Sequence, residues 1–177
     1  MSRYEVEPNV FYEVRGGHFR NESVGYKRGD VELVVQLSEG PISYDGYHDE
    51  TQTTINIYTI KEQKGLLNKL RKKMNKEPLK DKERVTEPVE ISRTIDEFLQ
   101  EKDKSKFIKN EAVRKLVEEA CGVIVEKGRP AHKEHLRQQD EIRKAEYKAR
   151  DEAIRKEQEQ KDLIATKKIN DFFNDGK

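Results

Sequence analysis

The sequence predicts an α+β protein, in which a small antiparallel β-rich N-terminal module is followed by a helical C-terminal half with a long charged helix. Apolar residues alternate with a period of two within residues 4–60, as in half-buried strands. After residue 61 they recur with helical spacing instead. Between Pro130 and Phe173 there is neither glycine nor a further proline, which favours one long helix.

The composition limits both the size of the core and the class of protein. The 177 residues include 36 basic and 35 acidic side chains, and only 33% of all residues are hydrophobic. A typical globular domain has about 25% charged and about 45–50% apolar residues, glycine included. We therefore expect a modest core beside segments that are solvated or bound to a partner. The balance of the two signs argues against a basic nucleic-acid coat protein and against an acidic DNA mimic.

Four segments differ in composition. We expect a sheet with a covering amphipathic helix over residues 1–76, a charged linker over 77–92, short helices with an apolar stripe over 93–128, and a long charged helix with an apolar C-terminal end over 129–177. Residues 1–60 hold five basic and ten acidic side chains, whereas residues 61–84 hold ten basic and four acidic ones. Only this basic segment suggests a class of ligand.

In the N-terminal module we expect four or five strands between residues 4 and 60. The alternation is clearest over residues 31–38 and 54–60, and residues 9–15 predict a shorter strand. Turn signals separate these segments at Gly29-Asp30 and Asp45-Gly46. Asp-Gly is typical of a tight hairpin, because that turn requires positive φ. A sheet of this size must bury one face against another element.

The covering element is predicted at residues 62–75, where Leu66, Leu67, Leu70 and Met74 fall at helical spacing. In this interpretation the apolar residues pack on the sheet and the lysines face water. In the alternative, the basic side chains bind nucleic-acid phosphates. These side chains are Lys64, Lys69, Arg71, Lys72, Lys73 and Lys76. A helix lying on a membrane has the same pattern, but this segment lacks a bulky aromatic anchor.

Capping and stop signals divide the helical half. Thr94, with Glu97 three residues later, forms a capping box before a short helix. Asn110 caps a second helix, which has the clearest apolar stripe of the chain. The stripe consists of Val113, Leu116, Val117, Ala120, Cys121, Ile124 and Val125. Gly128-Arg129-Pro130 then predicts the end of that helix and the start of the next.

The last predicted helix is stabilised by ion pairs along its own surface rather than by apolar contacts with a second helix. Acidic residues precede basic ones by four positions in repeated pairs such as Glu157–Lys161, each worth about 0.2–0.5 kcal/mol. Its alanine-rich stripe is too thin for a leucine-zipper dimer. Large apolar residues gather at its end, namely Leu163, Ile164, Ile169, Phe172 and Phe173. This end is a candidate docking motif for a partner's groove. The alternative is that it folds back on the 113–125 helix or packs in a self-assembly.

Motifs for catalysis are missing from the sequence. It has no phosphate-binding Gly-rich loop, no Gly-x-Ser-x-Gly and no His-Glu-x-x-His. His132 and His135 share a helix face, but a catalytic zinc takes three protein ligands, so we expect both in solvent. Cys121 falls on the apolar stripe and is expected to be a buried, unreactive thiol. The loop around Tyr44 and Tyr47 is a candidate recognition loop rather than a metal site, and the alternative is an ordinary hairpin tip.

These patterns favour a non-enzymatic interaction or adaptor protein without cofactor or metal. It would bind a macromolecular partner, either another protein or a second copy, through the β-rich module, the apolar end of the long helix, or both. Its makeup is typical of small accessory or assembly proteins of phages and mobile elements. The alternatives are a nucleic-acid-binding protein that uses residues 61–84 and, third, a small metal-dependent hydrolase.

We expect a cytoplasmic protein without membrane contact. The sequence has no apolar run of about 18 residues, which a spanning helix requires. Its first residues lack the apolar stretch of a secretory signal. The single cysteine fits a reducing compartment.

Overall fold

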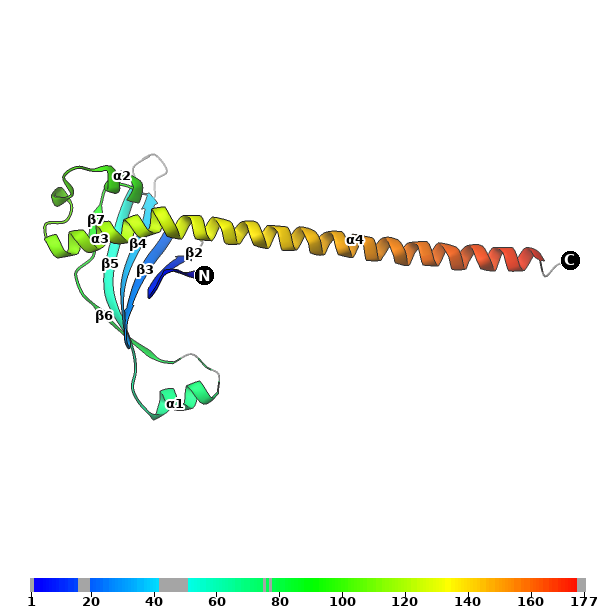
Figure 1. Ribbon diagram of the computed structural model, residues 1–177, viewed down its shortest axis with the longest axis horizontal. Coiled ribbons are helices and arrows are strands. Elements are labelled where there is room, and N and C mark those ends of the chain that lie inside the picture. The colour runs from blue at the N-terminus through cyan, green and yellow to red at the C-terminus, as the bar shows by residue number, and fades with distance from the viewer. Residues whose placement is uncertain (1, 16–19, 42–50, 75, 77, 175–177) are drawn as a thin grey trace. The chain divides into compact units, whose positions relative to one another are not determined.

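The computed structural model describes residues 2–15, 20–41, 51–74, 76 and 78–174, with the backbone alone described for 41, 72, 169 and 171–174. The fold is α+β, as predicted: an antiparallel sheet occupies the N-terminal part and helices make up the C-terminal half (Figure 1). The chain divides into two compact units, residues 1–132 and 133–177. The first unit contains the sheet and its covering helices.

The sheet is an antiparallel meander. Its strands are β1 (Ser2–Glu7), β2 (Val10–Arg15), β3 (Arg20–Arg28), β4 (Val31–Pro41), β5 (Thr51–Glu62), β6 (Lys80–Arg84) and β7 (Val89–Ile91). The order is β1-β2-β3-β4-β5-β6, and β7 also pairs with β5. The first five strands confirm the prediction of four or five. The expected turn between β3 and β4 is present, and Gly29 there has a φ of 62°, a left-handed conformation that favours glycine.

Residues 77–92 are not the linker that the sequence predicted. β6 and β7 lie in this segment, and both pair with β5 on the edge that β4 leaves open. All side chains of β6 are exposed, so its sequence has no apolar alternation to reveal a strand. Backbone pairing with β5 makes this segment a strand. Its lysines and Arg84 also discourage pairing with other chains at the edge of the sheet.

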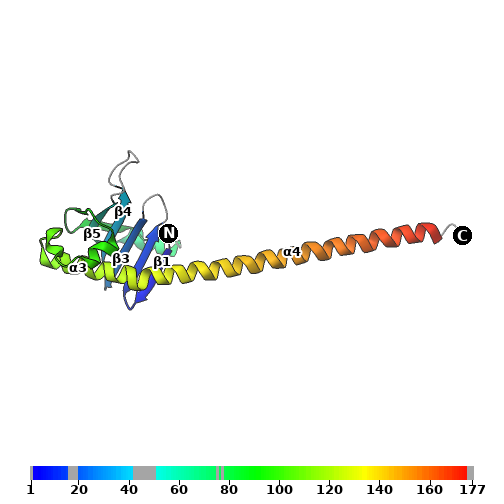
Figure 2. The same cartoon turned by 90° about the horizontal axis from the view of Figure 1, so that it is seen from above.

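Helices from the C-terminal half cover one face of the sheet (Figures 1 and 2). They are α2 (Ile95–Gln100), a short 3-10 helix (Lys104–Lys106) and α3 (Glu111–Val123). α2 buries Ile95 and Phe98, and α3 buries Val117, Ala120 and Cys121. The strands supply alternate residues to the same core: Tyr12, Val24, Val35, Leu37, Ile55, Ile57 and Ile91. The predicted stripe of α3 is therefore confirmed, and it is the cover of the sheet.

The helix that was predicted to cover the sheet does not do so. α1 (Leu66–Lys73) lies between β5 and β6, and its apolar side chains are exposed. The prediction followed the rule that an amphipathic stripe next to strands is a packing face. In the folded protein α2 and α3 already occupy the buried face of the sheet, so the leucines of α1 have no place in the core.

Both predicted helix starts are confirmed. Thr94 Oγ1 accepts a hydrogen bond from the Glu97 N–H (3.2 Å), and the Thr94 N–H donates to the Glu97 carboxylate (2.9 Å). Asn110 Oδ1 accepts from the N–H groups of Ala112 (3.0 Å) and Val113 (3.2 Å). These bonds satisfy donors that the first helical turn leaves without partners, and so they define where α2 and α3 begin.

The predicted break at Gly128-Arg129-Pro130 is wrong, because the helix continues through it. α3 passes by a π-helical turn (Ile124–Gly128) into α4 (Arg129–Asn174). The Arg129 N–H donates to Ile124 O, five residues back, as in a π-helix. This wider turn accommodates Pro130, which has no N–H to donate. Gly128 lets the turn pack against Tyr12, since a Cβ there would lie 2.5 Å from the tyrosine ring.

The second unit consists of α4 from Lys133 onward. Every side chain from Leu136 to Lys168 is exposed. The predicted ion pair between Glu157 and Lys161 is present at 2.7 Å. Within the described part of the chain, no helix has the length and apolar character that crossing a membrane requires.

Candidate functional site

The chain leaves the sheet between β5 and β6 in an excursion, residues 63–79, that carries α1. Asn68 closes its base. The Asn68 Nδ2 donates to the carbonyls of Gln63 (2.7 Å) and Leu79 (2.9 Å), and its Oδ1 accepts from the Leu79 N–H (2.7 Å). The Gln63 N–H also donates to Leu79 O at 2.9 Å. Asn68 is only 4% exposed, although it lies in the middle of a surface helix.

Replacing Asn68 by Ala should loosen the excursion without unfolding the sheet. The change leaves the Gln63 carbonyl and the Leu79 N–H without partners, whereas Leu79 O keeps its bond from the Gln63 N–H. This loss costs about 1–3 kcal/mol. We expect amide hydrogen exchange in residues 63–79 to accelerate by about tenfold or more, since about 1.4 kcal/mol is a factor of ten. Asn56→Ala on β5 is the control, because the Asn56 side chain makes no described hydrogen bond. Equal exchange in both variants would contradict the role of Asn68.

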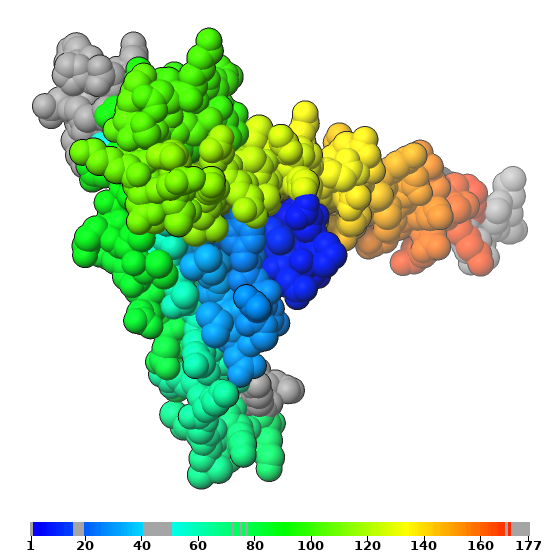
Figure 3. Space-filling model, turned by 60° about the vertical axis from the view of Figure 1, so that its left-hand side comes forward, coloured from blue at the N-terminus to red at the C-terminus, as the bar shows by residue number. Residues whose placement is uncertain are grey.

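The apolar residues of α1 point away from this anchor. Leu66, Leu67, Leu70 and Met74, which we call the α1 face, are 74%, 60%, 47% and 62% exposed. At 3.6 residues per turn they fall within an arc of roughly 100° around the helix, and Asn68 lies on the opposite side. The excursion forms a lobe at one end of the sheet, and α2 and α3 lie at the other end (Figure 3). The helix is therefore attached by its polar side and presents its apolar side outward.

The predicted cationic residues surround the α1 face. Lys69, Lys73 and Lys76 are exposed. Lys64 is also exposed and lies 3.4 Å from the Asp30 carboxylate. Arg71 is half-buried. The side chain of Lys72 lies outside the described residues. The structure thus joins the apolar and the basic groups of residues 62–76 in one surface.

A cleft of about 950 Å³ separates the excursion from the end of the sheet. Five cations and three carboxylates line it. Arg3 forms an ion pair with Glu32 at 2.7 Å. The Glu32 carboxylate lies over Gly25, where a Cβ would collide with it. Lys27, Lys69 and Lys80 have no ion-pair partner among the described residues. The cleft therefore has an excess of positive charge.

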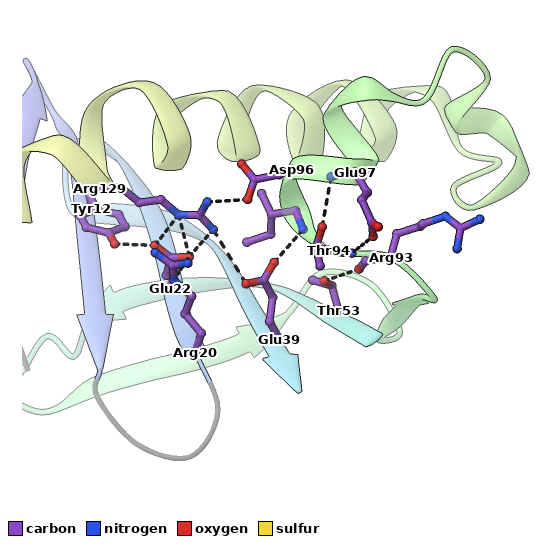
Figure 4. A network of polar contacts seen from close by, with 11 residues as sticks. Tyr12, Arg20, Glu22, Glu39, Thr53, Arg93, Thr94, Asp96, Glu97 and Arg129 are labelled. Atoms are coloured by element: carbon purple, nitrogen blue, oxygen red, sulfur yellow. Dashed lines mark hydrogen bonds and ion pairs between the residues drawn. The ribbon is translucent and has the colours of Figure 1, made fainter. Parts of the chain in front are cut away.

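The main buried polar cluster lies elsewhere, where the first turn of α4 meets the sheet (Figure 4). Glu22 on β3, which is 1% exposed, accepts from Tyr12 Oη at 2.6 Å and from Arg129 Nη2 at 2.9 Å. Arg20 Nε lies 3.1 Å from the same carboxylate. Arg129 also donates to Asp96 on α2 at 2.7 Å. We call these five residues the Glu22 cluster; it ties four elements of the first unit together, namely β2, β3, α2 and the start of α4.

Both proton donors to Glu22 hold their protons firmly. Burial raises the pKa of Tyr12, and its hydrogen bond to Glu22 raises it further. Partial burial lowers the pKa of Arg129, but hydrogen bonds to Glu22 and Asp96 outweigh it and leave the pKa above its ordinary value. Neither group therefore exchanges a proton near neutral pH, so these contacts fit a structural role.

The cysteine and the histidines that could act as nucleophile or metal ligands have structural surroundings instead. Cys121 is buried, which raises the pKa of its thiol to about 12 and makes it unreactive. His132 is not free in solvent as expected: its Nδ1 lies 2.8 Å from the hydroxyl of Tyr4. His135 is likewise half-buried rather than exposed. Among the described residues, no three His, Cys, Asp or Glu side chains are grouped as metal ligands.

The predicted docking residues are described only in part. Leu163 and Ile164 on α4 are 69% and 57% exposed. Ile169, Phe172 and Phe173 belong to α4 by their backbone, but their side chains lie outside the described residues. Tyr44 and Tyr47 fall in residues 42–50, which also lie outside them.

Sequence reasoning missed Asn68 and the Glu22 cluster. Asn68 resembles any polar residue of a surface helix, so no signal distinguishes it. For Glu22 a weak signal exists, because it alternates with the buried Val24 and therefore occupies an inward position of a strand. Its partner Arg129 is 107 residues away, and no local pattern links the two.

Comparison with protein-family models, with curated protein sequences and with solved structures gives no match for this chain.

Proposed function

We propose that this chain is a non-enzymatic interaction protein whose β-rich N-terminal part binds a partner outside the chain through the α1 face. The observation that carries the proposal is the orientation of α1. Its four apolar side chains are exposed, although the helix is anchored to the sheet by Asn68.

The free energy that burial of these exposed side chains in an interface would contribute supports this proposal. Burying a leucine or methionine side chain contributes about 1.5–3 kcal/mol relative to leaving it in water. Single exposed apolar residues are ordinary, but a contiguous exposed group is typical of an interaction site. The α1 face is such a group, because its members follow one side of one short helix.

A second contact lies at the end of α4, where Leu163 and Ile164 are exposed. We retain it as part of the proposal, since two large apolar residues in sequence on a highly charged helix fit a docking motif. Its further members, Ile169, Phe172 and Phe173, follow within ten residues.

Nucleic-acid binding by residues 61–84 is the second candidate function. The observation that favours it is the cleft beside α1, where Lys27, Lys69 and Lys80 have no described ion-pair partner. Lysines that form no ion pair are available to phosphates. This candidate ranks second because phosphate binding gives no role to the α1 face.

Crosslinking in cells of the native source tests the leading proposal without assuming a class of partner. A photoreactive benzoylphenylalanine in place of Leu67 should give discrete crosslinked products on irradiation, because a bound partner lies against that side chain. The products are identified by mass spectrometry.

The matched control carries the same group in place of Lys109, which is exposed in the first unit and far from α1 in sequence. It should give only a weak background. Crosslinking at residue 67 no stronger than at residue 109 would refute binding through the α1 face.

A further inference from the structure

The charge around the α1 face restricts the kind of partner. Residues 64–76 hold six Lys or Arg side chains and no Asp or Glu. The whole chain has a net charge of +1, so the remaining residues sum to −5. Attraction to an anion is therefore concentrated in the excursion, and the rest of the protein opposes it.

The cations also have a definite place relative to the α1 face. At about 100° per residue, Lys69 and Lys73 lie on one side of the apolar arc and Arg71 on the other. Lys69 and Lys73 are exposed. A matching partner is therefore apolar opposite the α1 face and anionic beside Lys69 and Lys73.

The residue types distinguish the classes of partner. The cores of protein interfaces are depleted in Lys and enriched in aromatic residues, Met and Arg. Residues 64–76 instead hold five lysines against one arginine and one methionine, and they include no aromatic residue. A nucleic acid pairs with the lysines but leaves the leucines in water. The surface of an anionic bilayer accepts both, because acyl chains receive the apolar residues and headgroup phosphates receive the cations.

The anchor of α1 suits this kind of binding. A helix this short is barely stable alone in water, so a free peptide would have to fold as it binds. Asn68 and the backbone bond between Gln63 and Leu79 hold the excursion in place before any partner arrives. The ordering cost of binding is therefore reduced.

We propose that α1 binds the surface of a membrane rich in anionic phospholipids, with the α1 face inserted at the level of the headgroups. This inference rests on the proposed function and names the partner. It departs from the expectation of no membrane contact, which followed from the missing aromatic anchor. The sequence did not reveal that the leucines face outward, where they are available for insertion in place of an aromatic anchor.

Sedimentation with vesicles tests the proposal on the full chain. The protein should pellet with vesicles of three parts phosphatidylcholine to one part phosphatidylserine, and should stay in solution with phosphatidylcholine alone. Raising NaCl from about 0.1 M to about 1 M shortens the Debye length from about 10 Å to about 3 Å, and should weaken the binding strongly.

Two pairs of substitutions separate the apolar and the electrostatic parts of the binding. Leu67→Ser with Leu70→Ser should lower the partition coefficient about tenfold or more. Lys69→Glu with Lys73→Glu should lower it about tenfold or more as well. The matched controls are Ile142→Ser with Ile154→Ser on α4, and Lys102→Glu with Lys109→Glu in the first unit. Both controls should stay within about twofold of the original protein, because these residues lie outside the α1 face.

Every outcome decides the question. If the protein does not pellet with the anionic vesicles while crosslinks at residue 67 persist, the lipid inference is overturned and the proposed function stands. Binding of a single-stranded oligothymidylate that the lysine variant loses and the leucine variant keeps would also overturn it, in favour of nucleic acid. If crosslinks and vesicle binding are both missing, the inference and the proposed function fail together.

Discussion

Replacing Arg129 by methionine should lower the free energy of unfolding by about 3–5 kcal/mol, the typical loss when one partner of a buried ion pair is removed. The Glu22 side chain is fully buried, and Arg129 supplies its hydrogen bond at 2.9 Å. Without Arg129 the carboxylate keeps its desolvation cost and loses its main cation. Asp96 and Glu39, which lie 2.7 Å and 3.8 Å from Arg129, lose the same partner. Urea denaturation followed by circular dichroism measures the change.

Arg20→Met is the control for this prediction. Arg20 lies 3.1 Å from the same carboxylate, but its side chain is half exposed, so water screens the pair. We expect a loss below about 1 kcal/mol. Adding Glu22→Gln to Arg129→Met should restore part of the stability, because no buried charge then lacks a partner. Equal losses for Arg129→Met and Arg20→Met would show that the Glu22 cluster does not depend on Arg129.

Replacing Gly128 by alanine should destabilise the protein by about 1–3 kcal/mol, although alanine favours helix. A Cβ at this position would lie 2.5 Å from two ring carbons of Tyr12. The ring has little freedom to move, because it is buried and its hydroxyl donates to Glu22 at 2.6 Å. The helix or the tyrosine must shift, and either shift disturbs the Glu22 cluster.

Gly122 provides the matched control in the same helical run. A Cβ at Gly122 meets no atom within 4 Å, so the substitution adds only helix propensity. Gly122→Ala should therefore raise the free energy of unfolding by up to about 1 kcal/mol. The two identical substitutions should thus act in opposite directions in thermal or urea unfolding. Stabilisation by both would contradict the close contact between Gly128 and Tyr12.

Features that depend on a few neighbouring residues were predictable. The strands follow from period-two alternation, and Thr94 and Asn110 mark the starts of α2 and α3 because caps bond to the next turn of the same chain. The stripe of α3 also follows from spacing alone. The candidate site was predicted in part: the sequence identified the apolar and the basic residues of α1, but it assigned the apolar ones to the core.

The errors have a common physical origin. An amphipathic stripe shows that one side of a helix avoids water, but it does not show which surface is available to receive it. In this fold α2 and α3 take the face of the sheet, and Asn68 attaches α1 by its polar side. The charges of β6 gave no hint of a strand, because its pairing with β5 is made by the backbone.

The sequence by itself determined the α+β class, the starts of two helices, the apolar stripe of α3 and the charge of the excursion. All of these rest on periodicity, caps or composition, which act over a few residues. Only the tertiary structure decided that the α1 face points outward, that the helix continues past Gly128, and that Glu22 meets Arg129. These depend on contacts between segments as far apart as 107 residues, where space and partners, rather than local preference, select the arrangement.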